Sequence, residues 1–359
     1  MKMIILIGHP AHVHMFKYFA HEMIERGHDV LFLTTDKEFE IELLKKENFD
    51  YVILGKKRRG IIKKIWDTMC RTIKTYKIAR KFHPSIFLSH GSLIAAFVSK
   101  LMHRPHISFE DTYNMEQVKV YAPFTEVILT SNYPHPLSQH KHNISIPMFN
   151  ALLYLHPNKY NIPTKDESMD NRYVLVRFVA WNASHDIGHS GIVYEDKVNL
   201  IKSVSKYAQV YISSESELPS EFEQYRLRMA PDKIHDILAH ASLVFSEGST
   251  MVEEAAMLGT PSIYINNKGT LYTDLLEEKY DLCYTFAENQ IAEATGKALS
   301  ILQRQDAELR SEWQSKRQRM LHDYIDVTTF LVWFAENYPT SQSQTQENQE
   351  NQAFWAQFK

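Results

Sequence analysis

The stretch Ser246-Glu-Gly-Ser-Thr-Met-Val-Glu-Glu-Ala-Ala-Met-Leu-Gly-Thr-Pro261 predicts a turn and a short helix between two buried strands. The flanking segments, Ala241–Phe245 and Pro261–Ile265, are short apolar runs of the strand type. Gly259, followed closely by proline, is typical of a helix end. A strand, a helix and a second strand in this order indicate an α/β fold.

The first turn of this predicted helix carries candidate binding groups. Thr250 and Glu253 have the spacing of a capping box. The amides of Gly248, Ser249 and Thr250 would lie at the positive end of the helix dipole, which favours a phosphate. With Glu253 engaged in the cap, Glu254 is left to accept hydrogen bonds from hydroxyls such as those of a ribose. The stretch therefore predicts either a nucleotide-sugar site or an ordinary capped helix.

Length and composition favour a globular protein with two domains. The chain has 359 residues, of which 44% are hydrophobic and 23% charged, and a net charge of -3 argues against a nucleic-acid-binding protein. Its two cysteines, Cys70 and Cys283, form no disulfide framework and lack metal-ligand spacing, so we expect a cytoplasmic protein. The apolar run Met3–Ile7 is too short for a signal peptide, and no run is long enough to span a membrane.

Histidines follow the first predicted strand. Met3–Ile7 is followed by His9, His12 and His14, and then by a helix and a second strand, which together form a βαβ unit. Ligands bind at the carboxyl ends of the strands in such units, so His12 and His14 are candidates for a general base or a phosphate contact. Alternatively, one of them only bonds the backbone at the helix start. No cysteine or carboxylate lies nearby in the sequence, so we predict no metal site.

Two further strand ends carry polar clusters. Ser89–Ser92 follows one predicted strand, and Glu110 and Asp111 follow the next, Pro105–Phe109. Two adjacent carboxylates suit general-base work and the binding of sugar hydroxyls, because crowding raises the pKa of one of them. Alternatively, Asp111 or Thr112 only caps the following helix.

Residues 56–81 are strongly basic, with eleven Lys or Arg and the single acidic residue Asp67. Apolar residues recur at helical spacing through this segment, which predicts a basic amphipathic helix. Either it packs on the sheet with a solvated basic face, which we favour slightly, or it also contacts anionic lipid at the inner face of the cell membrane.

Composition divides the rest of the chain into segments. The Pro-, His- and Asn-rich residues 131–165 suggest a connection, which gives predicted domains at 1–165 and 166–325. A helix over residues 326–339 is expected to return to the first domain, and the Gln- and Asn-rich residues 340–359 are expected to be disordered.

A loop after the first strand of the second domain is dense in polar and aromatic residues. Arg177 is a candidate for binding a diphosphate, and Trp181 for stacking on a base or sugar, unless it packs in the core. His185 and Asp186 are a candidate acid–base pair.

Several of these segments resemble known proteins. Glu247–Pro261 resembles the nucleotide-binding segment of UDP-N-acetylglucosamine 2-epimerases and related GT-B glycosyltransferases. Gly8–Lys17, Phe109–Thr112, Val176–Trp181 with His185–Gly188, and the stretch Ser246–Pro261 are similar to an uncharacterised prokaryotic family of epimerase-like GT-B proteins. The resemblance implies two Rossmann-like domains facing a cleft, with the diphosphate on the small-residue turn and the ribose on Glu254.

The resemblance leaves the reaction open. Where the epimerases carry an aspartate, this chain has Ser92. Loss of a carboxylate would cost an acid–base step worth about 100-fold or more. We therefore expect a metal-independent glycosyltransferase that transfers a sugar from a UDP-linked donor to a cell-envelope glycan or lipid-linked acceptor, with His14 or Glu110 as base. The alternatives are a nucleotide-sugar 2-epimerase and a nucleotide-sugar-binding protein without turnover.

Overall fold

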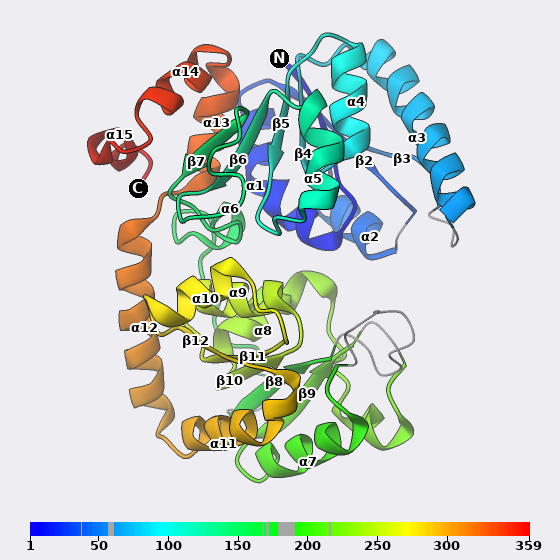
Figure 1. Cartoon of the computed structure of the whole chain (residues 1–359). Helices are drawn as coiled ribbons and strands as arrows, with labels where there is room; N and C mark the ends of the chain where they lie inside the picture. Colours follow the sequence, from blue (N-terminus) through cyan, green and yellow to red (C-terminus); the bar gives the residue numbers. More distant parts are fainter. Residues whose placement is uncertain (37, 57–60, 168, 170–171, 179–190, 215–216) are drawn as a thin grey trace. The chain divides into compact units, whose positions relative to one another are not determined.

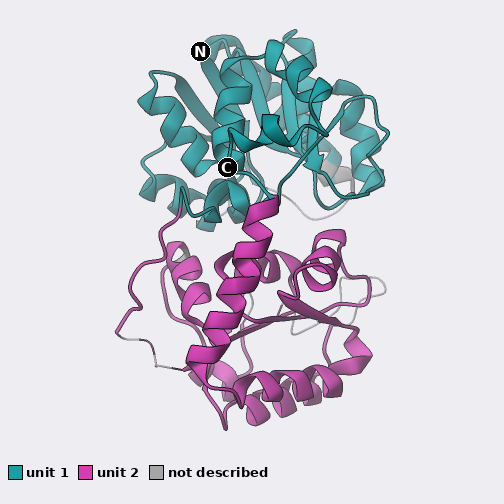
Figure 2. Ribbon diagram, turned by 90° about the vertical axis from the view of Figure 1, so that its left-hand side faces the viewer, with its two compact units in different colours: residues 1–159, 324–359 teal, residues 160–323 magenta. Residues whose placement is uncertain are grey.

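The chain folds into two compact units, each with its own parallel sheet. The computed structural model describes residues 1–36, 38–56, 61–167, 169, 172–178, 191–214 and 217–359 (Figure 1). Unit 1 comprises residues 1–159 and 324–359, and unit 2 comprises residues 160–323 (Figure 2). The chain therefore leaves unit 1 once and returns to it.

Unit 1 is built on a seven-stranded parallel sheet with the order β3-β2-β1-β4-β5-β6-β7. Its strands are β1 (Lys2–Leu6), β2 (Asp29–Thr34), β3 (Tyr51–Ile53), β4 (Ile86–His90), β5 (His106–Phe109), β6 (Val127–Ser131) and β7 (Asn143–Ile146). The central strands are almost wholly apolar because helices cover both of their faces. Ile4 and Leu6 on one face pack with Ala95 and Val98, whereas Phe109 of β5 contacts Phe16.

The helices of unit 1 form two packed groups. They are α1 (Pro10–Glu25), α2 (Glu38–Lys46), α3 (Ile61–Phe82), α4 (Leu93–Leu101), α5 (Met115–Tyr121), α6 (Leu152–Leu155), α13 (Val327–Glu336), α14 (Thr340–Glu347) and α15 (Gln352–Ala356), with a 3-10 turn at Ala122–Phe124. Helix α1 packs against α6 and α13, and α4 packs against α3 and α5. Residues 131–165, predicted from their composition to be a connection, contain β7 and α6.

Residues 340–359 contain the two helices α14 and α15, so the prediction of a disordered tail was wrong. Trp355 and Phe358 are buried, and the Phe358 ring lies 5.3 Å from that of Phe330 and 5.2 Å from that of Trp333. The Trp355 indole donates a hydrogen bond to the Gln349 carbonyl at 2.9 Å. A few large aromatic side chains therefore supply the buried area that the polar composition of the segment does not suggest.

Unit 2 contains a five-stranded parallel sheet with the order β12-β11-β10-β8-β9. Its strands are β8 (Tyr173–Arg177), β9 (Gln209–Ser213), β10 (Leu243–Ser246), β11 (Ser262–Ile265) and β12 (Cys283–Phe286). Its helices are α7 (Tyr194–Val204), α8 (Ile234–His240), α9 (Ser249–Leu258), α10 (Leu271–Glu278), α11 (Ile291–Leu302) and α12 (Asp306–Asp323), with 3-10 turns at Ser220–Tyr225, Pro231–Lys233 and Glu288–Gln290. The quoted stretch of the sequence thus forms the end of the central strand β10, helix α9 and the turn into β11.

Helix α9 begins earlier than the capping-box spacing predicts. Gly248 is the N-cap residue and no side chain caps it, so Thr250 is the second helical residue. Glu253 is then the fifth, too far along the helix to bond the N-cap amide, and it is buried. The predicted capping box was therefore wrong, although the helix itself and its end at the left-handed Gly259 are as expected.

No helix among the described residues is both long and apolar enough to cross a lipid bilayer.

Candidate functional site

The turn from β10 into α9 presents backbone donors at the carboxyl edge of the unit 2 sheet. The Ser246 hydroxyl accepts a hydrogen bond from the Gly248 amide at 2.9 Å and donates to the Gly248 carbonyl at 2.8 Å, which closes the turn. Gly248 and Ser249 are half-buried and Thr250 is exposed. The amides of Ser249 and Thr250 are the first of the helix, where no intrahelical acceptor exists. This edge therefore combines amide donors with the positive end of the α9 dipole.

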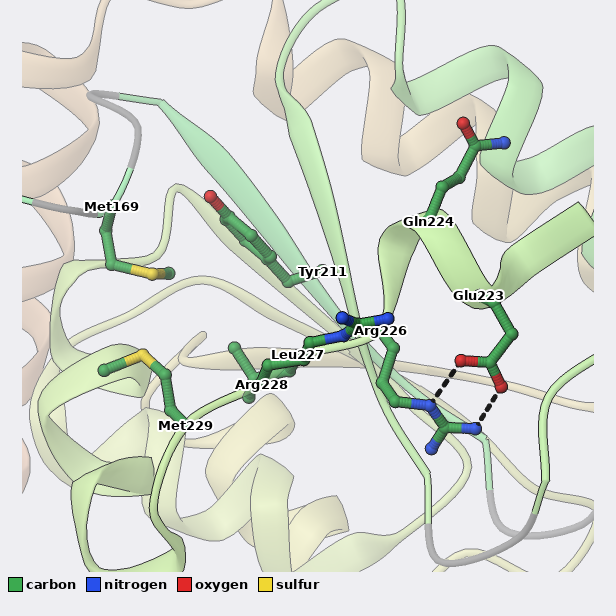
Figure 3. Close-up of a pocket in the computed structure, with 8 residues that line it drawn as sticks. All are labelled: Met169, Tyr211, Glu223, Gln224, Arg226, Leu227, Arg228 and Met229. Atoms are coloured by element: carbon green, nitrogen blue, oxygen red, sulfur yellow. Dashed lines mark hydrogen bonds and ion pairs between the residues drawn. The ribbon is translucent and has the colours of Figure 1, made fainter.

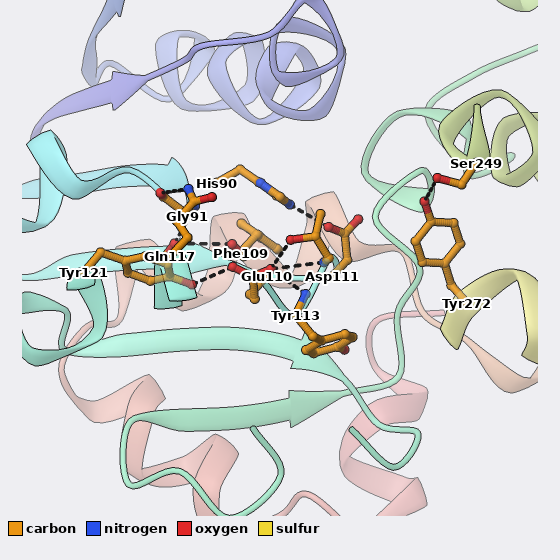
Figure 4. A network of polar contacts seen from close by, with 12 residues as sticks. His90, Gly91, Phe109, Glu110, Asp111, Tyr113, Gln117, Tyr121, Ser249 and Tyr272 are labelled. Carbon is orange, nitrogen blue, oxygen red and sulfur yellow. Dashed lines mark hydrogen bonds and ion pairs between the residues drawn. The ribbon is translucent and has the colours of Figure 1, made fainter. Parts of the chain in front are cut away.

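A tyrosine from the next helix fixes the side chain at this turn. The Tyr272 hydroxyl of α10 donates a hydrogen bond to Ser249 Oγ at 2.6 Å (Figure 4). Thr270 caps α10, since its hydroxyl accepts from the Thr273 amide at 3.4 Å. Ser249, the first residue of α9, is thus held by Tyr272 of the capped helix α10.

Arg177 ends β8, the strand next to β10. It lies opposite Ser246 in the register, and its carbonyl accepts from the Glu247 amide at 3.0 Å. Its guanidinium Nη1 donates to Ser213 Oγ, at the end of β9, at 3.3 Å. The structure therefore places the predicted diphosphate ligands, Arg177 and the amides of the turn, at one edge of one sheet. Trp181 and His185, together with Asp186, lie outside the described residues.

A buried ion pair, which was not predicted from the sequence, supports this edge. Lys197 Nζ of α7 lies 3.5 Å from Glu247 Oε2, and both side chains are buried. Glu247 Oε1 also accepts from the Ile192 amide at 2.7 Å, and Lys197 lies 4.6 Å from the centre of the Phe178 ring. Burial lowers the pKa of Lys197, against the opposing effect of the nearby Glu247 carboxylate. Glu247, which lies within the stretch Ser246–Pro261, was the signal that could have drawn attention to the pair.

Glu254, the predicted ribose ligand, is buried and contacts a histidine. Its Oε1 lies 3.1 Å from Nε2 of His235, a buried residue of α8. The prediction that Glu254 is left to bind hydroxyls depended on the capping box, which is not present. Because a carboxylate can accept several hydrogen bonds, a ribose contact stays a prediction.

At the carboxyl edge of the unit 1 sheet, a histidine and an aspartate form a pair. His90 Nε2, at the end of β4, lies 2.8 Å from Asp111 Oδ1, just beyond β5, and both side chains are largely buried (Figure 4). The His12 ring lies 5.0 Å from that of His90, and its Nδ1 accepts from the Gly8 amide at 3.3 Å. The sequence identified His12 and Asp111 but gave His90 no role, because their proximity arises only when β4 and β5 pair.

Glu110 lies next to Asp111 but in a different environment. Its buried carboxylate accepts from the Thr112 amide, the Thr112 hydroxyl, the Tyr113 amide and the Tyr121 hydroxyl, at 3.0, 2.6, 2.9 and 2.7 Å. Burial, with the Glu110 charge beside it, raises the pKa of Tyr121, so this phenol stays protonated and donates. These contacts hold the turn after β5.

His14 is also buried, on α1, with its ring 5.8 Å from that of Tyr154. The roles of His14 and Glu110 as bases stay predictions. Ser92 is the N-cap of α4, where its hydroxyl accepts from the Ala95 amide at 3.3 Å. Within the described part of the chain, no three His, Cys, Asp or Glu side chains are grouped so as to hold a metal ion.

A separate cavity of about 490 Å³ lies beside β9, the edge strand of unit 2 (Figure 3). Its lining consists of Met169, Tyr211, Glu223, Gln224, Arg226, Leu227, Arg228 and Met229. Arg226 and Glu223 form a two-point ion pair at 2.8 and 2.5 Å. Among the described residues, no predicted site residue lines this cavity.

Known structures share this two-sheet architecture. One, from Listeria monocytogenes and assigned as a UDP-N-acetylglucosamine 2-epimerase, gives a TM-score of 0.65 at 12% identity, covering 94% of this chain and 96% of that one. The structure of the Methanocaldococcus jannaschii UDP-GlcNAc 2-epimerase in complex with UDP-GlcNAc and UDP gives a TM-score of 0.59 at 12% identity. The match covers 85% of this chain and 94% of that one. MurG of Acinetobacter baumannii gives a TM-score of 0.55 at 12% identity, covering 92% of this chain and 98% of that one.

The chain has a GT-B fold. The two parallel sheets with flanking helices and the near-complete coverage of both chains establish this. No family model and no curated protein matches the sequence. At 12% sequence identity, this structural similarity establishes the GT-B fold but does not establish an activity.

Proposed function

We propose that this protein is a glycosyltransferase that uses a UDP-linked nucleotide-sugar donor bound by unit 2. The observation that carries the proposal is the edge of the unit 2 sheet, where Arg177 ends β8 and the amides of the β10–α9 turn follow the end of the adjacent strand β10. Amides at a helix N-terminus and a guanidinium are two complementary ligands for a diphosphate.

The same groups would stabilise the leaving group during transfer. The bond between the anomeric carbon and the diphosphate oxygen breaks, and negative charge develops on that oxygen. Fixed amide dipoles and Arg177 would offset this charge, as preorganised donors do in enzymes generally. We therefore propose transfer without a metal ion, to be tested by assaying activity with EDTA.

Proton transfer is assigned to unit 1. An acceptor hydroxyl that attacks the anomeric carbon must lose its proton to a base. An ionised Asp111 only accepts hydrogen bonds, so it selects the His90 tautomer with the proton on Nε2 and leaves the lone pair on Nδ1. We propose His90 as this base and Asp111 as the residue that orients it, with His12 beside them. A cell-envelope glycan or a lipid-linked sugar is the proposed acceptor.

The test begins with donor binding. Thermal-shift measurements with UDP-, GDP-, CMP- and dTDP-linked sugars should show stabilisation by one nucleotide class. Arg177→Ala should abolish that shift, and Arg226→Ala, which alters an arginine beside the separate cavity, should retain it. Equal stabilisation of Arg177→Ala and the unaltered protein would overturn the proposed donor site.

The reaction is decided by following a labelled sugar. Transfer to an acceptor supports the proposal, whereas a C2-inverted sugar on the free nucleotide would show an epimerase. Ser92 acts as a helix cap at the position where the epimerases carry an aspartate, and this favours transfer. Binding without either product would show a nucleotide-sugar-binding protein.

A further inference from the structure

Helix α3 exposes a stripe of large apolar side chains. Ile65, Trp66, Met69 and Ile73 are 58, 61, 54 and 54% exposed. Ile65, Met69 and Ile73 are spaced four residues apart, and at 3.6 residues per turn they follow one another along one side of the helix, with Trp66 beside them. We call these four residues the α3 stripe.

The α3 stripe is not the side by which the helix joins the core. Asp67, Thr75 and Ala79 are buried, and Ala79 belongs to the cluster formed with β1, β4 and α4. Tyr76, Ile78 and Phe82 pack against the same cluster. The helix therefore already has a core-facing side, and the stripe is a second apolar side that faces solvent.

Positive charge accompanies the stripe. The four-residue row that begins with Ile65, Met69 and Ile73 continues as Lys77 and Lys81, which are both exposed. Lys63 and Arg80 are exposed as well, and Asp67, the one acidic residue of α3, is buried. Since the whole chain has a net charge of -3, this basic character is local to the helix.

We propose that α3 docks this protein on an anionic lipid bilayer. An apolar side with tryptophan, bordered by lysines on the same helix, is the pattern of helices that lie in the membrane interface. The stripe would enter the boundary between headgroups and acyl chains. The aliphatic stems of Lys77 and Lys81 would extend their ammonium groups to lipid phosphates. The proposal concerns a membrane surface and does not depend on the proposed sugar transfer.

Cys70 provides a direct readout, because it is exposed on α3 whereas Cys283 is buried. A polarity-sensitive fluorophore on Cys70 should shift to shorter wavelength with phosphatidylcholine vesicles that contain about 30% phosphatidylglycerol, and much less with phosphatidylcholine alone. The same fluorophore on exposed Ser300→Cys of unit 2, in a Cys70→Ser background, should not shift.

Variants test the two components separately by vesicle co-sedimentation. Trp66→Ser with Ile73→Ser should reduce binding at all salt concentrations. Lys77→Glu with Lys81→Glu should weaken binding by about tenfold or more at low salt and remove its salt dependence. Leu101→Ser is the matched control, because Leu101 is 51% exposed on α4 and lies outside the stripe. All of these positions are exposed, so thermal unfolding should be unchanged and will confirm folding.

Three results would overturn the proposal. One is equal binding to neutral and anionic vesicles, and another is binding that the stripe variants leave intact. The third is a concentration-dependent dimer that Ile73→Ser abolishes, without vesicle binding, because a second copy would then cover the stripe.

Discussion

At the scale of single residues, adjacent carboxylates have different environments. Glu110 is buried under four hydrogen-bond donors, whereas Asp111 contacts His90. Since Asp111 orients the proposed base, Asp111→Asn should lower kcat by about 100-fold and leave the KM for the donor nearly unchanged. Steady-state kinetics of sugar transfer measure both parameters.

The control for this variant is Glu116→Gln, an exposed carboxylate at the start of α5. It should retain full activity. A pH–rate profile separates positioning from a general structural defect, because the basic form of His90 would titrate at a different pH without Asp111. An Asp111→Asn protein with unaltered kcat and profile would remove the pair from the mechanism.

His106 makes the stability of the protein depend on pH. Its ring nitrogens contact Ser89 Oγ and Thr125 Oγ1, both at 2.9 Å, and complete burial lowers its pKa to about 3 from an ordinary 6.5. The unfolded chain binds this proton first, so the contribution is complete above about pH 6.5 and is lost as the pH falls toward 3. Near pH 5 the loss should approach about 1.4 kcal/mol per pH unit.

Denaturant unfolding between pH 7 and pH 4.5 measures this slope. His106→Asn should be less stable at pH 7 but should show a shallower decline on acidification. His103→Asn, at an exposed neighbour, should retain the slope of the unaltered protein. Parallel slopes for all three proteins would show that other groups cause the decline.

Residues near each other in sequence were easier to predict than residues brought together by folding. Gly248–Thr250 and Arg177 could be identified because strand ends and helix starts have local signals. The pairing of His90 with Asp111, and of Glu254 with His235, depends on which strands and helices are neighbours. A one-dimensional pattern does not contain that information, and the incorrect capping box made Glu254 look more accessible than it is.

At the scale of elements, helix α9 ends at Gly259, where any side chain should lower the free energy of unfolding. Gly259 has φ +74°, and a Cβ there would lie 2.5 Å from Gln314 Nε2, which donates to the Leu258 carbonyl. Gly27, after α1, has φ +82° with nothing within 4 Å of its Cβ position. Gly27→Ala should therefore cost about 1 kcal/mol, for the left-handed backbone alone. Gly259→Ala should cost about 2–3 kcal/mol, because Gln314 must also leave the helix end.

Chemical denaturation of both variants measures the difference. Equal losses of stability would mean that Gln314 moves aside without a cost in free energy.

The prediction of a disordered tail was also wrong at the scale of elements. Hydrophobic periodicity fails over residues 340–359 because burial there rests on isolated residues, chiefly Trp355 and Phe358, rather than on a continuous apolar side.

At the scale of the whole molecule, the two units differ in how the chain builds them. Unit 2 is one continuous segment, residues 160–323, with its own sheet and with Trp313 of α12 buried in it. Unit 1 needs both ends of the chain. Helix α13 packs on α1 and α6, and the Thr328 hydroxyl donates to the Leu153 carbonyl at 2.6 Å.

Fragments of the chain should therefore behave differently. Residues 160–323 should fold alone and unfold cooperatively, because a unit with its own core is able to do so. Residues 1–159 alone should show no cooperative transition, because the apolar surfaces of α1 and α6 lose their cover. Joining residues 324–359 to this fragment through a Gly/Ser linker should restore the transition in circular dichroism melts, while the same linker with Phe330→Ser, a fully buried position on α13, should not. Cooperative folding of residues 1–159 alone would show instead that α13 and the tail are accessory to a core that the strands β1–β7 and the helices α1–α6 complete by themselves.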